Sequence, residues 1–236
     1  MSRNKLTIRL NKHPLRQGLI NHEFFRRVKV APLTREQVAI FIGQWWHPLH
    51  YFPTFLARSV ATLPDIESKS AVSKILSQET GEGDPKRAHE VVYIDTMGRA
   101  GFTEEQTTGA APFPETQALI AGYARASEDR LAAVGYIFAT EVADLAMVSG
   151  IGVSVGRVSG MKDLEWVNIH VQQEPDHVKE AEHAMLRSFS ADEEALMTVN
   201  AEEMWRQWIA FFDRIEKEVF ATAFSIQDGM PEAVTV

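Results

Sequence analysis

Apolar residues recur every three or four positions along most of the chain, and the strict alternation typical of an exposed strand is scarce. Helices are therefore predicted over about 14–27, 34–61, 66–80, 85 onward, 115 onward with a long apolar run over 130–155, 163 onward, and 192–223. The pattern indicates an all-α bundle of seven or eight helices. Because no internal repeat or linker divides the sequence, we expect one domain over residues 1–236.

Polar residues at the expected helix starts support these boundaries. Thr34 is followed three residues later by Gln37, which is the arrangement of a capping box. Acidic residues are placed to cap three later helices: Asp65, Asp84 (with Pro85 in the first turn) and Asp163. The start at Asp84 puts His89 in an early turn of its helix.

Glycines and prolines mark the expected interruptions. The glycines placed to end helices are Gly81, Gly83, Gly156 and Gly160. Pro48 and Pro53 should kink or interrupt the second helix, because each lacks the amide that a helix interior uses. Residues 98–114 should be mostly loop, with a short helical turn at 103–106.

Composition and charge narrow the class of partner. Hydrophobic residues make up 45% of the chain and charged residues 24%, which is typical of a soluble globular protein. The formal net charge of −8 argues against nucleic acid or an anionic membrane and favours a small-molecule partner. The longest uncharged run, 38–57, contains two prolines and two histidines and is a poor membrane span. The N-terminus lacks the apolar core of a signal peptide, so a cytoplasmic location is expected.

The chain contains no cysteine. This excludes disulfides, cysteine-ligated zinc, iron–sulfur clusters and a thiol nucleophile. Any metal site must therefore use histidine and carboxylate ligands.

The strongest candidate ligands are His170, Glu174 and His177. Their spacing of i, i+4 and i+7 places them on one face of a helix, since each residue advances by about 100°. Imidazole and carboxylate together suit iron, manganese or zinc. Pro175 lies within this segment, and it either kinks the helix in a way that aims the ligands or breaks it locally.

Two further segments supply matching groups. Glu79 and His89 flank a glycine-rich turn, so they can face each other across a corner, although Glu82 competes with Glu79 for this role. Glu141 lies in a very apolar helix, where a carboxylate is costly to bury unless it is paired or bound to a cation. Asp144, one turn later, is interpreted as a group behind the ligands or at the surface. The three segments together predict a dinuclear metal site.

The remaining histidines and one arginine are weaker candidates. His47 and His50 lie in an aromatic helix that should line the same cavity, where they would contact substrate, add a ligand or simply be satisfied core residues. Arg157 is a candidate clamp for a substrate carboxylate, with a surface role as the alternative. The other histidines look peripheral: His13, His22 and His183.

The ordered set of these ligands resembles the haem-oxygenase-like di-iron oxidases, relatives of haem oxygenase and of thiaminase-like and pyrroloquinoline-quinone-synthase-like proteins. The resemblance covers about residues 33–177 and rests on the Glu79-to-His89 segment, on Glu141, and on the final His-x3-acid-x2-His motif. Glu174 departs from the aspartate usual in that motif and adds one methylene. The paired Glu-x-x-His motifs of ferritin-like proteins are absent, so that pattern does not fit.

The resemblance implies two Fe(II) ions, O2 as co-substrate, and a haem-oxygenase-like bundle that acts on a small amine- or amino-acid-like metabolite. Such enzymes perform N-oxygenation, oxidative C–C cleavage or desaturation. A homodimer is also expected. The alternatives are a haem-binding member with His22, His47 or His50 as axial ligand, a cofactor-free oxidase, and a non-enzymatic helical binding protein. A thiaminase-type activity is disfavoured because its nucleophile is a cysteine.

Overall fold

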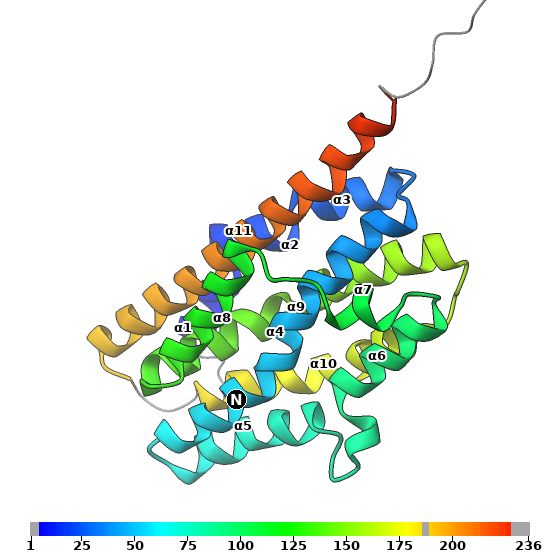
Figure 1. Ribbon diagram of the computed structural model, residues 1–236. Helices are drawn as coiled ribbons and strands as arrows, with labels where there is room; N and C mark the ends of the chain where they lie inside the picture. Colours follow the sequence, from blue (N-terminus) through cyan, green and yellow to red (C-terminus); the bar gives the residue numbers. More distant parts are fainter. Residues whose placement is uncertain (1–4, 186–188, 228–236) are drawn as a thin grey trace, which may run out of the picture.

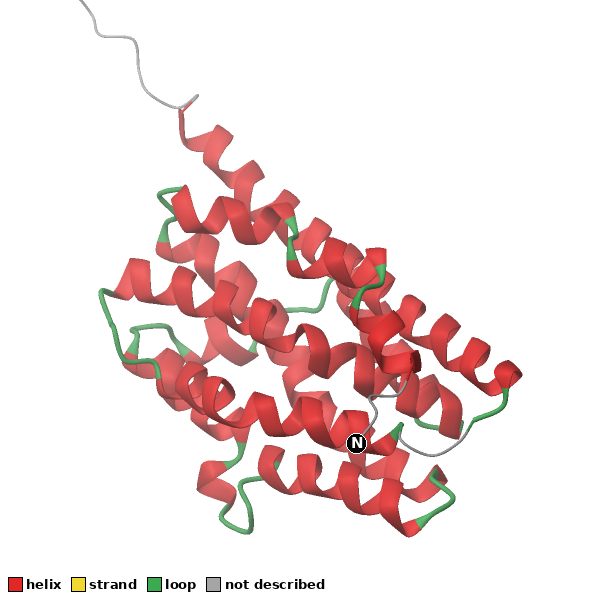
Figure 2. Cartoon of the chain, turned by 180° about the vertical axis from the view of Figure 1, so that it is seen from behind, coloured by secondary structure: helices red, strands yellow, loops and turns green. Residues whose placement is uncertain are grey.

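The computed structural model describes residues 5–185 and 189–227, and this part of the chain is all-α (Figures 1 and 2). The helices are α1 (Lys5–Asn11), α2 (Pro14–Ile20), α3 (Glu23–Val30), α4 (Arg35–Thr62), α5 (Ile66–Glu79), α6 (His89–Arg99), α7 (Glu104–Thr108), α8 (Pro114–Ala126), α9 (Arg130–Ser159), α10 (Glu165–Ala184) and α11 (Ala191–Gln227), with a 3-10 turn η1 (Pro85–Arg87) before α6. The all-α prediction is confirmed. The count is higher than seven or eight because four helices are eight residues or shorter.

The helix predicted over 14–27 is two helices. Asn21 leaves the helical conformation at φ −110° and ψ 23°, and His22 then caps α3 by accepting a hydrogen bond from the Phe24 amide. An N-cap histidine is uncommon, so the periodic apolar pattern gave no sign of this break.

Helix α4 follows the prediction at its start and departs from it inside. The Thr34–Gln37 capping box forms with both hydrogen bonds. Neither Pro48 nor Pro53 interrupts the helix, which continues to Thr62. Aromatic packing holds α4 in place: the Trp45 and Trp208 rings lie 5.3 Å apart, which joins α4 to α11.

The central element of the bundle is α9, which packs against α3, α4, α10 and α11. Figure 1 shows α11 along one long edge of the molecule and α5 at the opposite edge. By length and composition α9 is apolar enough to cross a membrane, but 78% of its most apolar window is buried inside the fold. Its hydrophobicity is therefore that of a core helix. Gly160 ends it in a left-handed conformation, while Gly156 lies within it.

Two smaller boundary predictions need correction. Residues 98–114 contain more helix and less loop than expected. Helix α6 continues to Arg99, and the predicted turn at 103–106 is part of α7, which has its own capping box. Asp163 does not cap α10. Leu164 occupies that position, and the Asp163 carboxylate accepts a hydrogen bond from the Asn168 side chain instead.

Candidate metal centre

Four helices bring the six predicted ligands together. Glu79 is the last residue of α5, His89 the first of α6, and Glu141 lies in the middle of α9. The remaining three come from one face of α10: His170, Glu174 and His177. Pro175 does not break α10, so the i, i+4, i+7 face stays intact. All six side chains are buried.

The turn between α5 and α6 sets Glu79 opposite His89. Gly81, Glu82 and Gly83 adopt positive φ values of 86°, 55° and 93°. A Cβ on Gly81 would lie 2.2 Å from the Asp84 carbonyl oxygen, so no other residue fits there without displacing the backbone. The same turn holds Glu82 at the surface. Its exposed carboxylate lies 3.3 Å from Arg87 and forms an ion pair with it. The structure therefore places Glu79, and not Glu82, among the other predicted ligands.

We expect Gly81→Ala to impair metal binding without removing a ligand. The clash with the Asp84 carbonyl forces the turn to shift, and His89 begins the helix that follows it. A misplacement of about 1 Å is enough to spoil a ligand set. Gly83→Ala is the matched control, because a Cβ there meets no atom within 4 Å although its φ is also positive. Metal titration of both variants would measure the difference, and equal losses would contradict the steric argument.

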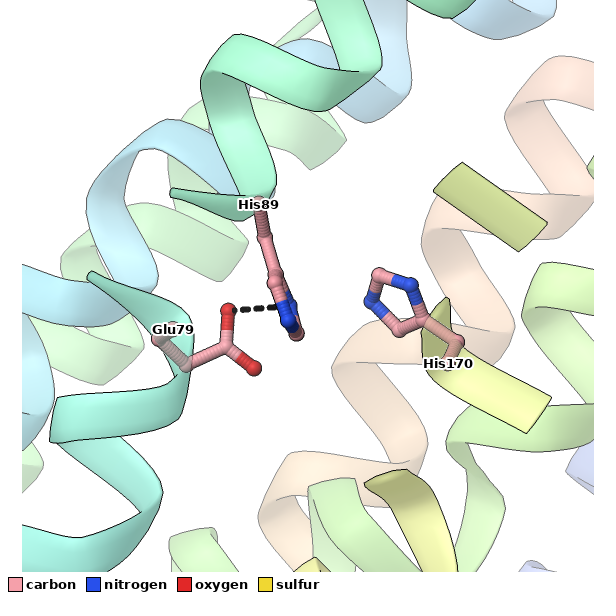
Figure 3. A group of neighbouring side chains, drawn as sticks. All are labelled: Glu79, His89 and His170. Carbon is pink, nitrogen blue, oxygen red and sulfur yellow. Dashed lines mark ion pairs between the residues drawn. The ribbon is translucent and has the colours of Figure 1, made fainter. Parts of the chain in front are cut away.

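The first ligand group consists of Glu79, His89 and His170, with one ligand atom from each lying within 4.8 Å of the others. Figure 3 shows these three side chains pointing toward one another. Nδ1 of His89 lies 2.9 Å from Oε2 of Glu79. The other nitrogen of His89, Nε2, is 2.9 Å from Oε1 of Gln173, and Nδ1 of His170 is 2.8 Å from the Trp166 carbonyl. These outer bonds fix each ring so that its remaining nitrogen faces the site.

The second group consists of Glu141, Glu174 and His177, again with ligand atoms within 4.8 Å of one another. Nδ1 of His177 lies 3.4 Å from Oε2 of Glu141 and 3.8 Å from Oε2 of Glu174. It is also 3.7 Å from Oε1 of Glu79, so the two groups are contiguous. The first group offers one oxygen and two nitrogens, and the second offers two oxygens and one nitrogen.

Several polar atoms in this cluster are enclosed without a hydrogen-bond partner among the described residues: Oε1 of Glu141, Oε1 of Glu174 and Nε2 of His177. A buried polar atom without a partner costs free energy, and an unpaired charge costs more. Cations bound among these atoms would satisfy them together. The donor set of carboxylates and imidazoles therefore fits two ions such as Fe(II) or Mn(II).

Electrostatics couples the histidines to the carboxylates. Burial by itself would lower the pKa of His177, but the charge of Glu141 and its hydrogen bond raise that pKa to about 9. Burial would likewise raise the pKa of Glu79, yet the charge and hydrogen bond of His89 lower it to about 2. The pKa of His170 falls to about 3, through burial and the charge of His89. The cluster thus holds protons on some of the atoms that a metal would occupy.

Asp144 takes the first of its two predicted positions, behind a ligand. The residue is partly exposed, but its Oδ2 is fully enclosed, and its carboxyl group contacts that of Glu174. Burial and the charge of Glu141 raise the pKa of Asp144 to about 7. Burial, with the charges of Asp144 and Glu141, raises the pKa of Glu174 well above its usual value. The sequence signal for the position of Asp144 is its i, i+3 spacing from Glu141, which places both side chains on the same face of α9.

Asp144→Asn should stabilise the metal-free protein at neutral pH. A carboxyl whose pKa is raised in the fold disfavours folding above its unfolded pKa of about 4, and asparagine removes that penalty while keeping a hydrogen bond to Glu174. We expect a gain of about 1 kcal/mol, or about 2–4 °C in Tm for a chain of this size. The gain should vanish below about pH 4. Thermal unfolding across pH tests this, with exposed Asp176→Asn as control; equal gains in both variants would contradict it.

A small cavity adjoins the ligands. It has a volume of about 40 Å³, and its polar lining residues are Glu79, Thr140, Glu141, Asp144, His170 and Glu174. The remaining lining residues are aromatic or apolar: Trp45, Pro48, Leu49, Phe52, Tyr123 and Trp208. Such a space holds a few water-sized molecules in a largely dry setting.

The three residues predicted to bind substrate do not line this cavity. Nε2 of His47 lies 2.9 Å from the Ala110 carbonyl, and exposed His50 pairs with Glu90 at 2.7 Å. The two histidines lie on the side of α4 opposite Trp45, Pro48, Leu49 and Phe52. His47 comes two residues after Trp45 and His50 two residues after Pro48, and a helix turns by about 200° over two residues. Arg157 donates to the Val28 and Lys29 carbonyls at the end of α3. It therefore anchors α3 to α9.

The arrangement of helices is shared with proteins of known structure. A CADD-like protein of unknown function from Nostoc punctiforme superposes with a TM-score of 0.76 at 15% identity, over 91% of this chain and 96% of that one. A TenA homolog from Pseudomonas syringae gives 0.71 at 15% identity, over 91% and 93%. A domain of unknown function with a heme oxygenase-like fold from Shewanella denitrificans gives 0.69 at 16%, over 94% of each chain. At these identities the matches show the fold alone, which is haem-oxygenase-like.

Fold and site together define an all-α protein with a buried histidine–carboxylate centre suited to metal. Residues 39–210 match the family of iron-containing redox enzymes, and the chain belongs to this family. The predicted resemblance is confirmed at this level, and it makes the protein an iron-containing oxidoreductase in general terms. A comparison with curated proteins returned no match.

Proposed function

We propose that the protein is an O2-activating, non-haem di-iron oxidase or oxygenase that acts on a small amine- or amino-acid-like metabolite. The observation that carries this proposal is the pair of contiguous, buried ligand groups, each with three ligand atoms within 4.8 Å of one another. Iron is the metal that the family description names. A single structural ion would leave one of the two groups unsatisfied.

Each residue of the centre would have a distinct role in such an enzyme. Glu79, His89 and His170 would hold one iron, and Glu141, Glu174 and His177 the other. When bound, two Fe(II) ions supply electrons for the reduction of O2. Gln173 and the Trp166 carbonyl orient the histidine rings, and the aromatic wall excludes water from the cavity. A cavity of about 40 Å³ next to the ligands suits O2 and the reacting end of a small substrate.

Anaerobic titration of the metal-free protein with Fe(II), followed by admission of O2, tests the proposal. We expect about two irons per chain and an O2-dependent change in the visible spectrum. His170→Ala should lose at least one iron and the spectral change, because it removes a nitrogen from the first group. His183→Ala, at the partly exposed end of the same helix, should leave both intact. No binding above one equivalent, or no response to O2, would overturn the di-iron proposal.

The haem-binding alternative is less well supported. A cavity of about 40 Å³ is far too small for a macrocycle, and each candidate axial histidine has another partner. Nε2 of His22 lies 3.1 Å from Asp213, while His47 and His50 bond to Ala110 and Glu90. A purely structural helical protein would leave the enclosed, unpartnered ligand atoms without a purpose.

A further inference from the structure

Trp45 carries a buried hydrogen-bond donor that is unused among the described residues. Its side chain is 4% exposed and lines the inner cavity beside the ligands. Its Nε1 is fully enclosed and has no hydrogen-bond partner in the described part of the chain. A buried tryptophan N–H ordinarily has a partner, as Trp205 does in the Ala139 carbonyl at 2.9 Å, because an unpaired one costs free energy. The donor of Trp45 therefore fits a partner from outside the chain.

Aromatic packing keeps the Trp45 ring from turning to find a partner elsewhere. Its centroid lies 5.3 Å from the Trp208 ring and 6.5 Å from the Phe212 ring. The Trp166 ring meets it edge-on at 6.1 Å. Rotation of so large a ring in a close-packed core would cost contacts on several sides. The N–H is therefore held in a fixed direction.

The other neutral polar groups of the cavity lining are already engaged. The Tyr123 hydroxyl and Oγ1 of Thr140 lie 2.9 Å apart and are hydrogen bonded to each other. Nε1 of Trp208 makes no full hydrogen bond, but it interacts with the same Tyr123 hydroxyl. The rest of the polar lining comes from the predicted metal ligands and Asp144. Within this lining, Trp45 is thus the neutral donor that is left over.

The size of the cavity limits what this donor can meet. A volume of about 40 Å³ holds roughly three water-sized spheres, since each takes about 10–15 Å³. A molecule of two or three atoms therefore fills it and lies close to the ligand residues and to Trp45 at once. An indole N–H can only donate, and a metal needs a lone pair. The molecule must accordingly offer lone pairs at both ends.

We propose that the Trp45 N–H holds a small acceptor molecule, of the class of O2 and the linear triatomic anions, in the inner cavity against the metal centre. The inference deepens the proposed function and rests on it, because it assigns a protein donor to the molecule that the same centre would take up. A fixed donor on one side and cations on the other favour such an acceptor over an inert molecule of equal size.

The indole N–H signals of protein labelled with ¹⁵N-tryptophan report this bond directly. The chain has five tryptophans, so five signals are expected, and single Trp→Phe variants assign them. Adding azide to the Zn(II)-loaded protein should move the Trp45 proton signal downfield, because a new hydrogen bond deshields that proton. The Trp166 signal is the matched internal reference. Its Nε1 is also enclosed without a partner among the described residues, but Trp166 does not line the cavity.

Azide affinity gives a second, independent measurement. Trp45→Phe keeps an aromatic ring in the lining and removes the donor, so it should weaken azide binding about tenfold. Trp205→Phe is the matched control, because it removes a buried indole N–H that lies outside the cavity, and it should leave azide affinity unchanged. Calorimetric titration of the Zn(II)-loaded variants measures both. If Trp45→Phe failed to fold, the wild-type Trp45 signal would still be assigned by elimination.

Azide binding that leaves the Trp45 signal in place, equal losses of affinity in the two variants, or no azide binding at all would overturn the inference. An equal shift in the metal-free protein would overturn it too, because the acceptor would then not need the metals. Zn(II) and azide undergo no redox change here, so this result is separate from the Fe(II) test. A Trp45 response without two irons or without O2 reactivity would refute only the di-iron proposal. Two irons and an O2 response with an unchanged Trp45 signal would refute only the role of Trp45.

Discussion

Saturating Fe(II) under anaerobic conditions should raise the unfolding temperature of the metal-free protein by roughly 8–16 °C. A ligand that binds only the folded state at about 1,000 times its Kd contributes about 4 kcal/mol. For a chain of this length each kcal/mol corresponds to about 2–4 °C. The contribution is large because the metals also satisfy the enclosed, unpartnered atoms of Glu141, Glu174 and His177. Thermal unfolding with and without Fe(II) measures it directly.

Glu141→Gln should remove most of this stabilisation. The change keeps the shape of the side chain but loses the negative charge that faces His177 at 3.4 Å and would hold a cation. Glu104→Gln neutralises an exposed glutamate on α7 and should respond to Fe(II) as the wild type does. If Glu141→Gln kept the full Fe(II)-induced shift, the metal would have to bind elsewhere, and both ligand groups would need to be reassigned.

The local part of the centre was predictable from the sequence. His170, Glu174 and His177 share a helix, so their spacing alone fixes their common face. The isolated Glu141 was predictable for a different reason, since an acidic residue in a core helix needs a partner. Both inferences depend on one helix at a time, and the structure places all four side chains in the interior.

The choice between Glu79 and Glu82 depended on backbone geometry that residue spacing does not encode. Three successive positive φ values from Gly81 to Gly83 direct one carboxylate inward and the other to solvent. His47 and His50 do not line the inner cavity, for a reason that the sequence does encode. A helical projection of Trp45, Pro48, Leu49 and Phe52 gives a continuous i, i+3, i+4, i+7 face, and neither histidine lies on it.

The contact between α2 and α9 was beyond reach of the sequence. Arg16 of α2 donates to the Val142 carbonyl of α9, and periodicity along one helix does not encode such a tertiary contact. The break at Asn21 depends on His22 as an N-cap, and its partner atoms lie in the backbone of the next turn. Where tertiary contacts decide a helix boundary, side-chain direction beyond that boundary cannot be inferred from periodicity.

Metal affinity should rise steeply with pH between about 6 and 9, and His177 is the main reason. Its pKa of about 9 means that the metal-free protein carries a proton on this ring at neutral pH. The ring faces Glu79 from α5, Glu141 from α9 and Glu174 on its own helix, and His89 stacks near it at 6.1 Å. A metal must displace the proton, so the apparent affinity falls about tenfold for each pH unit below 9 from this residue alone.

The pKa of His89 is also raised, because the charge and hydrogen bond of Glu79 outweigh the effect of burial, and it adds to the same slope. Competition with a chromophoric chelator, using Mn(II) under anaerobic conditions at several pH values, gives the apparent Kd. Calorimetry in buffers of different ionisation enthalpy counts the protons released, and we expect about one to two per chain at pH 7. If the affinity did not depend on pH over this range, the metal would not displace the proton of His177, and His177 would not be a ligand. The second ligand group would then have to bind through Glu141 and Glu174 without it.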